Sequence, residues 1–292
     1  MNFPNYFADA EASFKESNFV LFGIPYDKTG SFRRGTRKAP GAIRQASWNF
    51  ESYDLLTGID LKDIKIHDYG DLDIDINESS LRMKQKVKEF VTKVIKNKKM
   101  PLAIGGEHTV TLPVIDAIDE EKKDFCVVVF DAHLDFKDVY ENNPESHACV
   151  VRRISEIIGV ENIVILGARS GTKYEFEESK KQNLFFASSF EINNKGIDWA
   201  IRETLEKFKD KKIYLTLDID VLDPAYAPGT STPEPFGLSP FDVLNCIDRF
   251  SPQIIGFDIV EVCPPFDKGE TALLAAKLLR FVIDRIWSNK KA

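Results

Sequence analysis

The chain has 292 residues, 43% of them hydrophobic and 29% charged, which is the composition of an ordinary globular protein. Its 39 basic and 46 acidic residues give a formal net charge of −7. This balance argues against a nucleic-acid-binding protein, because phosphate affinity comes largely from clustered Lys and Arg. It is compatible with a small cationic substrate. No apolar run approaches the roughly 18 residues that a membrane span needs.

The first residues of the chain carry acidic side chains and no apolar core, so no signal peptide is predicted. The four cysteines form no C-x-x-C pair, and free thiols are typical of a reducing compartment. We therefore expect a cytoplasmic protein.

Short apolar runs alternate with longer helical patterns along the chain, which predicts parallel strands joined by crossover helices. The clearest helices are 80–97, 196–208 and 270–287, and Ser239 is expected to cap another helix with Pro240 at its first position. We predict a single three-layer α/β/α domain, 1–292, with a mainly parallel eight-stranded sheet. Its strands are expected at 19–24, 64–69, 102–106, 125–131, 162–168, 184–188, 213–218 and 254–261.

Polar side chains gather where four predicted strands end. One group alternates in VVVFDAHLDF and another in YLTLDIDVLDP, each directly after an apolar run. Alternate side chains of an extended segment point the same way, and open α/β sheets bind ligands at the carboxyl ends of their strands. Such groups would be costly to bury unpaired. The candidates are Asp131, His133 and Asp135, then Asp218 and Asp220, with His108 in GGEHTV and Glu261 in IIGFDIVE.

Two imidazoles and four carboxylates at matched strand ends predict a metal site, although each motif alone could be a solvated loop or a turn. The lack of thiolates among them favours Mn²⁺ or Mg²⁺ over a structural Zn²⁺ site. Six ligands are too many for one ion that also binds substrate, and they suit two ions that share carboxylates. A two-metal site lowers the pKa of a bound water, so the chemistry indicated is metal-assisted hydrolysis.

The motifs GGEHTV, DAHLDF and LDIDVLDPAYAPGTSTPEP resemble those of the ureohydrolase family, which includes arginases and agmatinases. EVCPPFDKGETALLAAKLL and FGIPYDKTGSFRRGTRKAPGAIR are similar to other segments of that family, and the motifs keep their order over most of the chain. The resemblance implies an arginase/deacetylase-like fold, two Mn²⁺ ions per chain, hydrolysis of a guanidino group, and a trimer or hexamer.

The resemblance also implies roles for individual residues. His147, in ESHACVVRRI, would transfer a proton, Glu261 would bind the guanidinium, and Asp135 would orient the bridging hydroxide. Asp131 and Asp218 would bridge the ions. One ion would be bound by His108, Asp131, Asp135 and Asp218, and the other by His133 and Asp220 together with the two bridging carboxylates.

Departures from the family's motifs bear on the substrate. Lys137 stands where arginases carry an Asn that holds the α-carboxylate, and the contexts of His147 and Glu261 look closer to agmatinases. Ser231 and Phe236 depart from the usual GTGTPEPGG. We therefore expect hydrolysis of agmatine to putrescine and urea. The alternatives are arginine, a guanidino acid or aminopropylagmatine as substrate, a non-catalytic binding subunit of the same fold, and a single-zinc deacetylase-like enzyme.

Other polar residues are expected to have structural roles. His67 lies in a predicted strand, Asp223 precedes a proline in a turn, and Cys149 lacks the second base that a thiol nucleophile would need. Glu107 and Asp258 lie beside motif residues, where they could serve as hydrogen-bond partners of the site.

Overall fold

The computed structural model describes residues 3–122 and 124–291. Its centre is an eight-stranded sheet in the order β2-β1-β3-β8-β7-β4-β5-β6, in which every neighbouring pair is parallel. The predicted strands are confirmed, each within two residues of its expected ends. They are β1 (Phe19–Gly23), β2 (Ile66–Asp71), β3 (Met100–Ile104), β4 (Phe125–Phe130), β5 (Ile163–Ala168), β6 (Phe185–Ser188), β7 (Lys212–Asp218) and β8 (Ile254–Val260).

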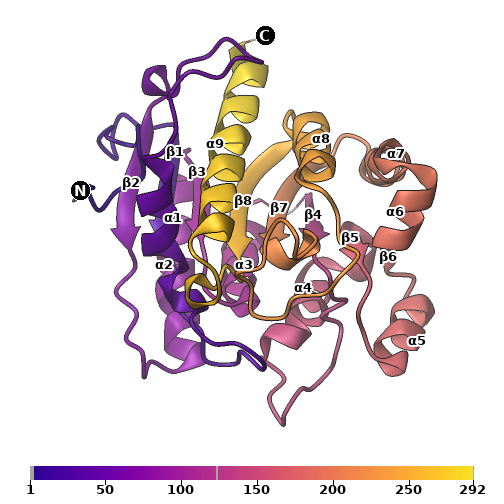
Figure 1. Ribbon diagram of the computed structural model, residues 1–292. Coiled ribbons are helices and arrows are strands. Elements are labelled where there is room, and N and C mark those ends of the chain that lie inside the picture. Colours follow the sequence, from indigo (N-terminus) through magenta and orange to yellow (C-terminus); the bar gives the residue numbers. More distant parts are fainter. Residues whose placement is uncertain (1–2, 123, 292) are drawn as a thin grey trace.

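Helices cover both faces of this sheet, which gives the predicted three layers (Figure 1). The three clearest predicted helices are present as α2, α7 and α9, and Ser239 caps α8 by accepting a hydrogen bond from the backbone N–H of Asp242 at 3.2 Å. The helices are α1 (Ala39–Ser47), α2 (Ser80–Lys96), α3 (Thr111–Glu121), α4 (Val150–Ile158), α5 (Lys173–Lys181), α6 (Ser189–Lys195), α7 (Ile197–Phe208), α8 (Pro240–Phe250) and α9 (Glu270–Lys291).

The apolar strand sequences fill two cores, one on each side of the sheet. In β4, Cys126, Val128 and Phe130 pack with residues of α1, α7, α8 and α9, whereas Val127 and Val129 pack with residues of α2, α3 and α4. Every residue of β4 is buried, and this two-sided burial is why the strand reads as a continuous apolar run. Within the described residues, we find no helix whose length and hydropathy would let it span a membrane.

Candidate metal centre and substrate cavity

The predicted metal ligands and Glu261 lie at or just beyond the carboxyl ends of four neighbouring strands at the centre of the sheet, β3, β8, β7 and β4, whereas His147 lies farther along the chain, directly before α4. The side chains converge as expected, but strand alternation is not the cause, because β4 ends at Phe130 and β7 at Asp218. Each motif folds into a tight turn instead. The backbone N–H of His133 donates to Asp131 Oδ1 at 2.6 Å, and that of Asp220 donates to Asp218 Oδ1 at 2.9 Å. An aspartate that accepts a bond from two residues further on is a common turn former.

The first group of ligand atoms surrounds Nδ1 of His108. This nitrogen lies 3.1 Å from Asp131 Oδ2, 3.4 Å from Asp218 Oδ2 and 3.6 Å from Asp135 Oδ2. Burial alone would lower the pKa of His108, but the facing carboxylates raise it well above its usual value. Three carboxylates therefore converge on one buried imidazole nitrogen.

The second group surrounds Nδ1 of His133, which lies 3.0 Å from Asp220 Oδ2 and 3.5 Å from Asp131 Oδ1. Asp131 thus offers one carboxylate oxygen to each imidazole. The structure contains two groups able to hold a metal ion within its described part, and Asp131 belongs to both: His108, Asp131 and Asp218 form one, and Asp131, His133 and Asp220 form the other.

The chemistry of these residues fits two divalent cations. Within the described residues, the buried atoms His108 Nδ1 and Asp131 Oδ2 have no hydrogen-bond partner, and such groups are costly to bury. Burial, together with the charges of Asp220 and Asp131, raises the pKa of Asp218 well above its usual range. Crowded carboxylates of this kind are stable in ionised form only beside cations. Two bound ions would satisfy the free atoms and compensate the charge.

A buried chain of hydroxyl and carboxyl groups orients His108. Thr216 Oγ1 donates to Asp258 Oδ1, and Tyr214 donates to Asp258 Oδ2 at 2.6 Å. Because the Thr216 proton is committed to Asp258, its oxygen accepts from His108 Nε2 at 3.1 Å. In the neutral ring this bond places the proton on Nε2 and leaves the lone pair of Nδ1 available to a metal ion. Asp258 therefore supports the site through Thr216, without touching a predicted ligand.

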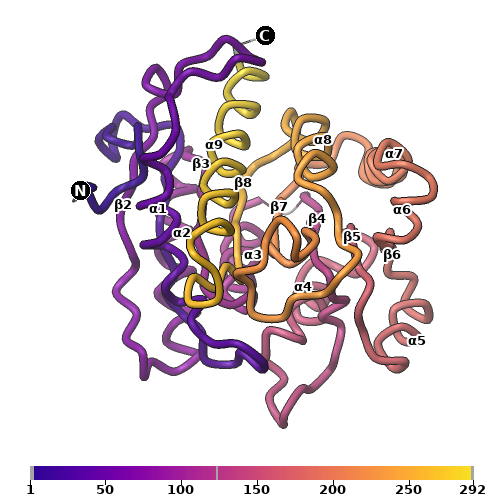
Figure 2. Tube along the Cα trace, in the orientation of Figure 1, coloured from indigo at the N-terminus to yellow at the C-terminus, as the bar shows by residue number. Residues whose placement is uncertain are grey.

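A second network holds His147. Its backbone N–H donates to Thr29 Oγ1 at 2.9 Å, and the ring nitrogen Nδ1 lies 3.1 Å from the same oxygen. Thr29 in turn donates to Glu107 Oε1 at 2.9 Å, so Nδ1 is the donor to Thr29. Nε2 then faces Ser31, at 3.5 Å. Figure 2 shows the two loops involved side by side, the indigo loop between β1 and α1 and the pink loop between β4 and α4. Burial lowers the pKa of His147.

Glu261 follows β8 in a left-handed backbone conformation, with φ of 61°. Its Oε1 accepts from the backbone N–H of His108 at 2.7 Å, and its Oε2 accepts from Ser231 Oγ at 2.6 Å. Burial raises the pKa of Glu261 to about 8. A carboxylate held in this way is ready to bind a cation, and binding would restore its ionised form.

One cavity of about 160 Å³ is lined by members of each of these groups, among them His133, Asp218, His147 and Glu261. At its lining, Lys137 forms an ion pair with Glu175 at 2.9 Å, and its ammonium also lies 5.4 Å from the ring centroid of Tyr140. The cavity is lined by Ser31, His133, Asp135, Lys137, Tyr140, His147, Ala148, Asp218, Thr232 and Glu261.

Some residues of the site were not predicted from the sequence, namely Thr29, Ser31, Tyr140 and Thr232. Thr29 and Ser31 lie in FGIPYDKTGSFRRG, the segment that resembles the family's opening motif, so that resemblance was the available signal. Thr232 lies in GTSTPEP, another segment that resembles the family, so the same signal was available for it. Tyr140 lies in a loop and follows no apolar pattern that would have marked it.

The residues expected to have structural roles do so. Nδ1 of His67 bonds to the carbonyl of Ala12 at 2.8 Å. Asp223 accepts from the backbone N–H groups of Ala225 and Gly237, at 2.9 and 3.0 Å, and so shapes the turn. Burial raises the pKa of Cys149 to about 11, which leaves its thiol protonated and a poor nucleophile at neutral pH.

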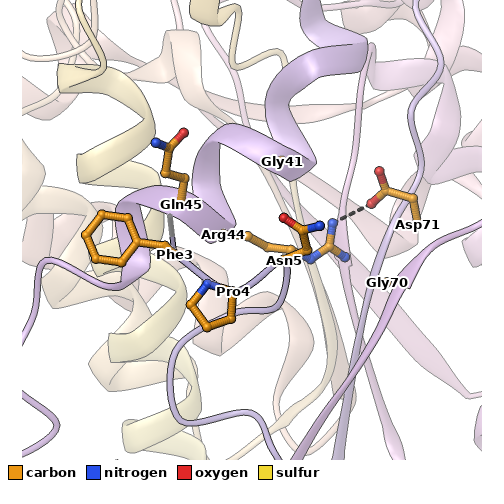
Figure 3. A pocket seen from close by; sticks show the side chains of 8 residues that line it. All are labelled: Phe3, Pro4, Asn5, Gly41, Arg44, Gln45, Gly70 and Asp71. Atoms are coloured by element: carbon orange, nitrogen blue, oxygen red, sulfur yellow. Dashed lines mark hydrogen bonds and ion pairs between the residues drawn. The ribbon is translucent and has the colours of Figure 1, made fainter. Parts of the chain in front are cut away.

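A larger cavity, of about 830 Å³, lies at the edge of the sheet near β2, away from the metal groups (Figure 3). Arg44 lines it, but Arg44 already binds Asp68, at 2.7 Å, and Asp71. No candidate metal group borders this cavity in the described part of the chain. We therefore place the functional site in the smaller, central cavity.

Comparison with known proteins agrees with this fold. The model of the Arginase family matches residues 17–283. The agmatinase of Bacillus anthracis is 35% identical over 280 residues, which cover 94% of this chain and 93% of that protein. The N(1)-aminopropylagmatine ureohydrolase of Thermococcus kodakarensis is 37% identical over 274 residues, 92% of this chain and 91% of that protein.

A solved structure, that of agmatine ureohydrolase of Thermoplasma volcanium, matches with a TM-score of 0.93 and 40% identity, covering 100% of this chain and 97% of that one. The chain therefore belongs to the arginase family of hydrolases, and the predicted arginase-like fold is confirmed.

Proposed function

We propose that this protein is an agmatinase, which hydrolyses agmatine with one water to putrescine and urea. The observation that carries the proposal is the shared position of Asp131 between two metal-binding groups, with Glu261 and His147 in the same cavity. A hydrolase for a charged, unreactive guanidinium needs a strong nucleophile, a carboxylate to hold the cation and a group to protonate the leaving amine. The agmatinase and agmatine ureohydrolase relatives support this substrate.

The metals proposed are two Mn²⁺ ions, because the six ligands are imidazoles and carboxylates without thiolate. When bound, the ions lower the pKa of a water held between them and so supply the nucleophile near neutral pH. Asp131 belongs to both metal groups and would be shared by the two ions, and Asp218, a member of the first group, would be shared as well by resemblance to the family. The remaining ligands would be His108 and Asp135 for one ion, and His133 and Asp220 for the other.

The other residues would act on the substrate directly. Glu261 would accept two parallel hydrogen bonds from the planar guanidinium and hold its carbon in place. Asp135 lies at the cavity wall, with its Oδ2 3.6 Å from Nδ1 of His108. It would orient the nucleophile. His147 would take up a proton at Nε2, the ring nitrogen left without one because Nδ1 donates to Thr29, and deliver it to the leaving amine. The Thr29 bond at Nδ1 suits this role, because it directs Nε2 toward Ser31 at the cavity wall.

A guanidino acid is the second candidate substrate, because the ammonium of Lys137 lines the cavity and could pair with a carboxylate. The deciding experiment is a urea-release assay with Mn²⁺-loaded protein on agmatine, arginine, guanidinobutyrate and aminopropylagmatine. Agmatine should have the highest kcat/KM. Urea release from none of the four would refute the proposal, and a single zinc ion per chain would favour a deacetylase-like enzyme.

We also propose that the protein assembles into a homo-oligomer, a trimer or hexamer. Support comes from large aromatic side chains that a single chain leaves uncovered, such as Phe236, 74% exposed, and Phe241, 75% exposed. Light scattering coupled to gel filtration would give the molar mass, and a mass of one chain would contradict an oligomer.

A further inference from the structure

Ser231 stands where the resembled motif carries glycine, and its hydroxyl reaches the carboxylate proposed to bind substrate. Ser231 Oγ donates to Glu261 Oε2 at 2.6 Å. The two residues are only 2% and 3% exposed. A buried hydroxyl this close to a carboxylate forms one of the stronger hydrogen bonds in a protein, because its acceptor is charged when ionised.

The backbone beside Ser231 is held independently of this hydroxyl. Thr230 pairs with Val262 in an antiparallel bridge, and Thr230 Oγ1 donates to the carbonyl of Glu261 at 3.1 Å. The N–H of Cys263 also donates to the carbonyl of Gly229, at 2.6 Å. Removing the Ser231 hydroxyl should therefore leave the two segments side by side and affect mainly the Glu261 side chain.

The two donors to Glu261 have a specific geometric effect. The backbone N–H of His108 occupies one lone-pair site on Oε1, and Ser231 occupies one on Oε2. A carboxylate has about four such sites, so roughly one remains on each oxygen. Two fixed donors, one per oxygen, prevent rotation of the carboxylate plane. A planar guanidinium needs both oxygens in one plane to form its two parallel bonds.

We propose that Ser231 is a positioning residue, which fixes the plane of the Glu261 carboxylate so that it selects a planar, two-point guanidino cation over a single-point alkylammonium. The idea rests on the substrate-binding role proposed for Glu261. An ammonium is a compact charge that one carboxylate oxygen can bind in many orientations. A freely rotating carboxylate would therefore lose guanidinium affinity while keeping most of its ammonium affinity.

The test compares Ser231→Ala, which removes the donor, with Ser231→Gly and Ser231→Thr. Thr retains the hydroxyl, and Gly matches the resembled motif. Calorimetry on Mn²⁺-loaded protein would measure binding of guanidinium chloride and n-butylammonium chloride separately, alongside metal content and KM for agmatine. A hydrogen bond to a charged group is worth about 1.5–3 kcal/mol, so Ala and Gly should weaken guanidinium binding by about tenfold or more. Butylammonium binding should change less than about threefold, with Thr closest to wild type.

Three outcomes would overturn the inference: unchanged guanidinium affinity in Ser231→Ala and Ser231→Gly, an equal loss for both cations, or loss of bound Mn²⁺. The last two would show a general structural role. KM should rise in the Ala variant with kcat changed much less, because the interaction concerns binding of the cation. If wild-type protein released urea from no guanidino substrate, the proposed function would fail, while the binding measurements would still decide the role of Ser231.

Discussion

Lys137 Nζ lies 2.9 Å from Oε2 of Glu175, a fully buried carboxylate in the first turn of α5. Glu175 is itself fixed, because it accepts from the backbone N–H and the hydroxyl of Thr172 at 2.8 and 2.9 Å, and from the N–H of Phe136 at 3.3 Å. The charge of Lys137 at the cavity wall is thus compensated by a rigid partner. This pair weakens both the repulsion of a cationic substrate tail and the attraction of a carboxylate.

The first prediction concerns agmatine and arginine, which differ by the α-carboxylate. We expect a kcat/KM at least about a hundredfold higher for agmatine, because burying an unpaired carboxylate costs several kcal/mol and each 1.4 kcal/mol is about tenfold. Lys137 is committed to Glu175 and replaces the arginase-type Asn. Initial rates of urea release over a range of concentrations would give both values, and equal values would show that the cavity accommodates the carboxylate.

The second prediction follows from the ion pair. Glu175→Gln removes the compensating charge and leaves the ammonium of Lys137 free at the cavity wall. We expect KM to rise for agmatine and to fall for guanidinobutyrate, each by about three- to tenfold, the scale of one partly screened charge interaction. Steady-state kinetics on both substrates would measure the changes.

The matched control is Lys137→Met, which removes the ammonium and keeps an unbranched side chain. For Lys137→Met we do not expect KM to rise for agmatine while it falls for guanidinobutyrate. A parallel change for both substrates in Glu175→Gln would indicate a distorted α5 and would exclude a charge effect.

The third prediction concerns the shared ligands. Asp131 contributes an oxygen to each metal group, so Asp131→Ala should lose both ions. Asp218→Ala should also lose both ions, because Asp218 is the second ligand proposed to be shared. Elemental analysis after dialysis against Mn²⁺ would count the ions, with Asp223→Asn as an acidic control that lies in a turn outside both groups. Full occupancy of two sites in the Asp131 variant would contradict the shared position.

The strands and the convergence of the candidate metal ligands could be predicted because their signals are local. Buried parallel strands require continuous apolar runs, and the polar motifs follow them directly, as Asp131 follows β4 and Asp218 ends β7. Of the helices, only α2, α7, α9 and the start of α8 were predicted with their positions, and α1, α3, α4, α5 and α6 were not. The helices α5 and α6 are short and bury few residues. Their capping boxes, Thr172 with Glu175 and Ser188 with Glu191, were nevertheless legible in the sequence.

The supporting contacts could not be predicted from local patterns. Thr29 and His147 are 118 positions apart, and Ser231 and Glu261 are 30 apart. Which hydroxyl reaches which partner depends on how irregular loops pack after the sheet has formed. The backbone conformation of Asp135 could not be predicted either. It is left-handed, with φ of 45°, and it follows from the turn and not from the spacing in DAHLD.

The fourth prediction concerns proton transfer. His147→Ala should retain both metal ions and most of the substrate affinity while kcat falls by about 10²–10⁴-fold, the usual range for a general acid or base. Cys149→Ser is the matched control, two positions away, and should keep kcat because the buried thiol, with a pKa of about 11, is no nucleophile. Rapid-mixing or steady-state assays would measure kcat for both variants, and metal analysis would count their bound ions. Loss of Mn²⁺ in His147→Ala would make this residue a ligand.

The fifth prediction links pH, metal and stability. In the metal-free protein, burial raises the pKa of Asp218 well above its usual range and that of Glu261 to about 8. Burial would lower the pKa of His133 and of His108, but the facing carboxylates raise both well above the usual value. All four groups therefore hold protons in the folded state that the unfolded chain releases. Their contribution to stability is complete below the unfolded values, about 4 for the carboxyl groups and about 6.5 for the imidazoles. It is lost as pH rises through the folded values.

The metal-free protein should therefore become less stable as pH rises from about 5 to about 8.5, whereas bound Mn²⁺ keeps its ligands among these groups, Asp218, His108 and His133, deprotonated in the folded state and removes most of this loss. Asp131 has a lowered pKa, because the imidazoles outweigh its burial, and its effect is confined to pH values below about 4. Thermal melts of wild type with chelator and with Mn²⁺ should show a Tm difference that widens with pH. Asp131→Ala with Mn²⁺ should follow the chelated curve, and a constant or narrowing difference for wild type would show that these buried groups are not held protonated without metal.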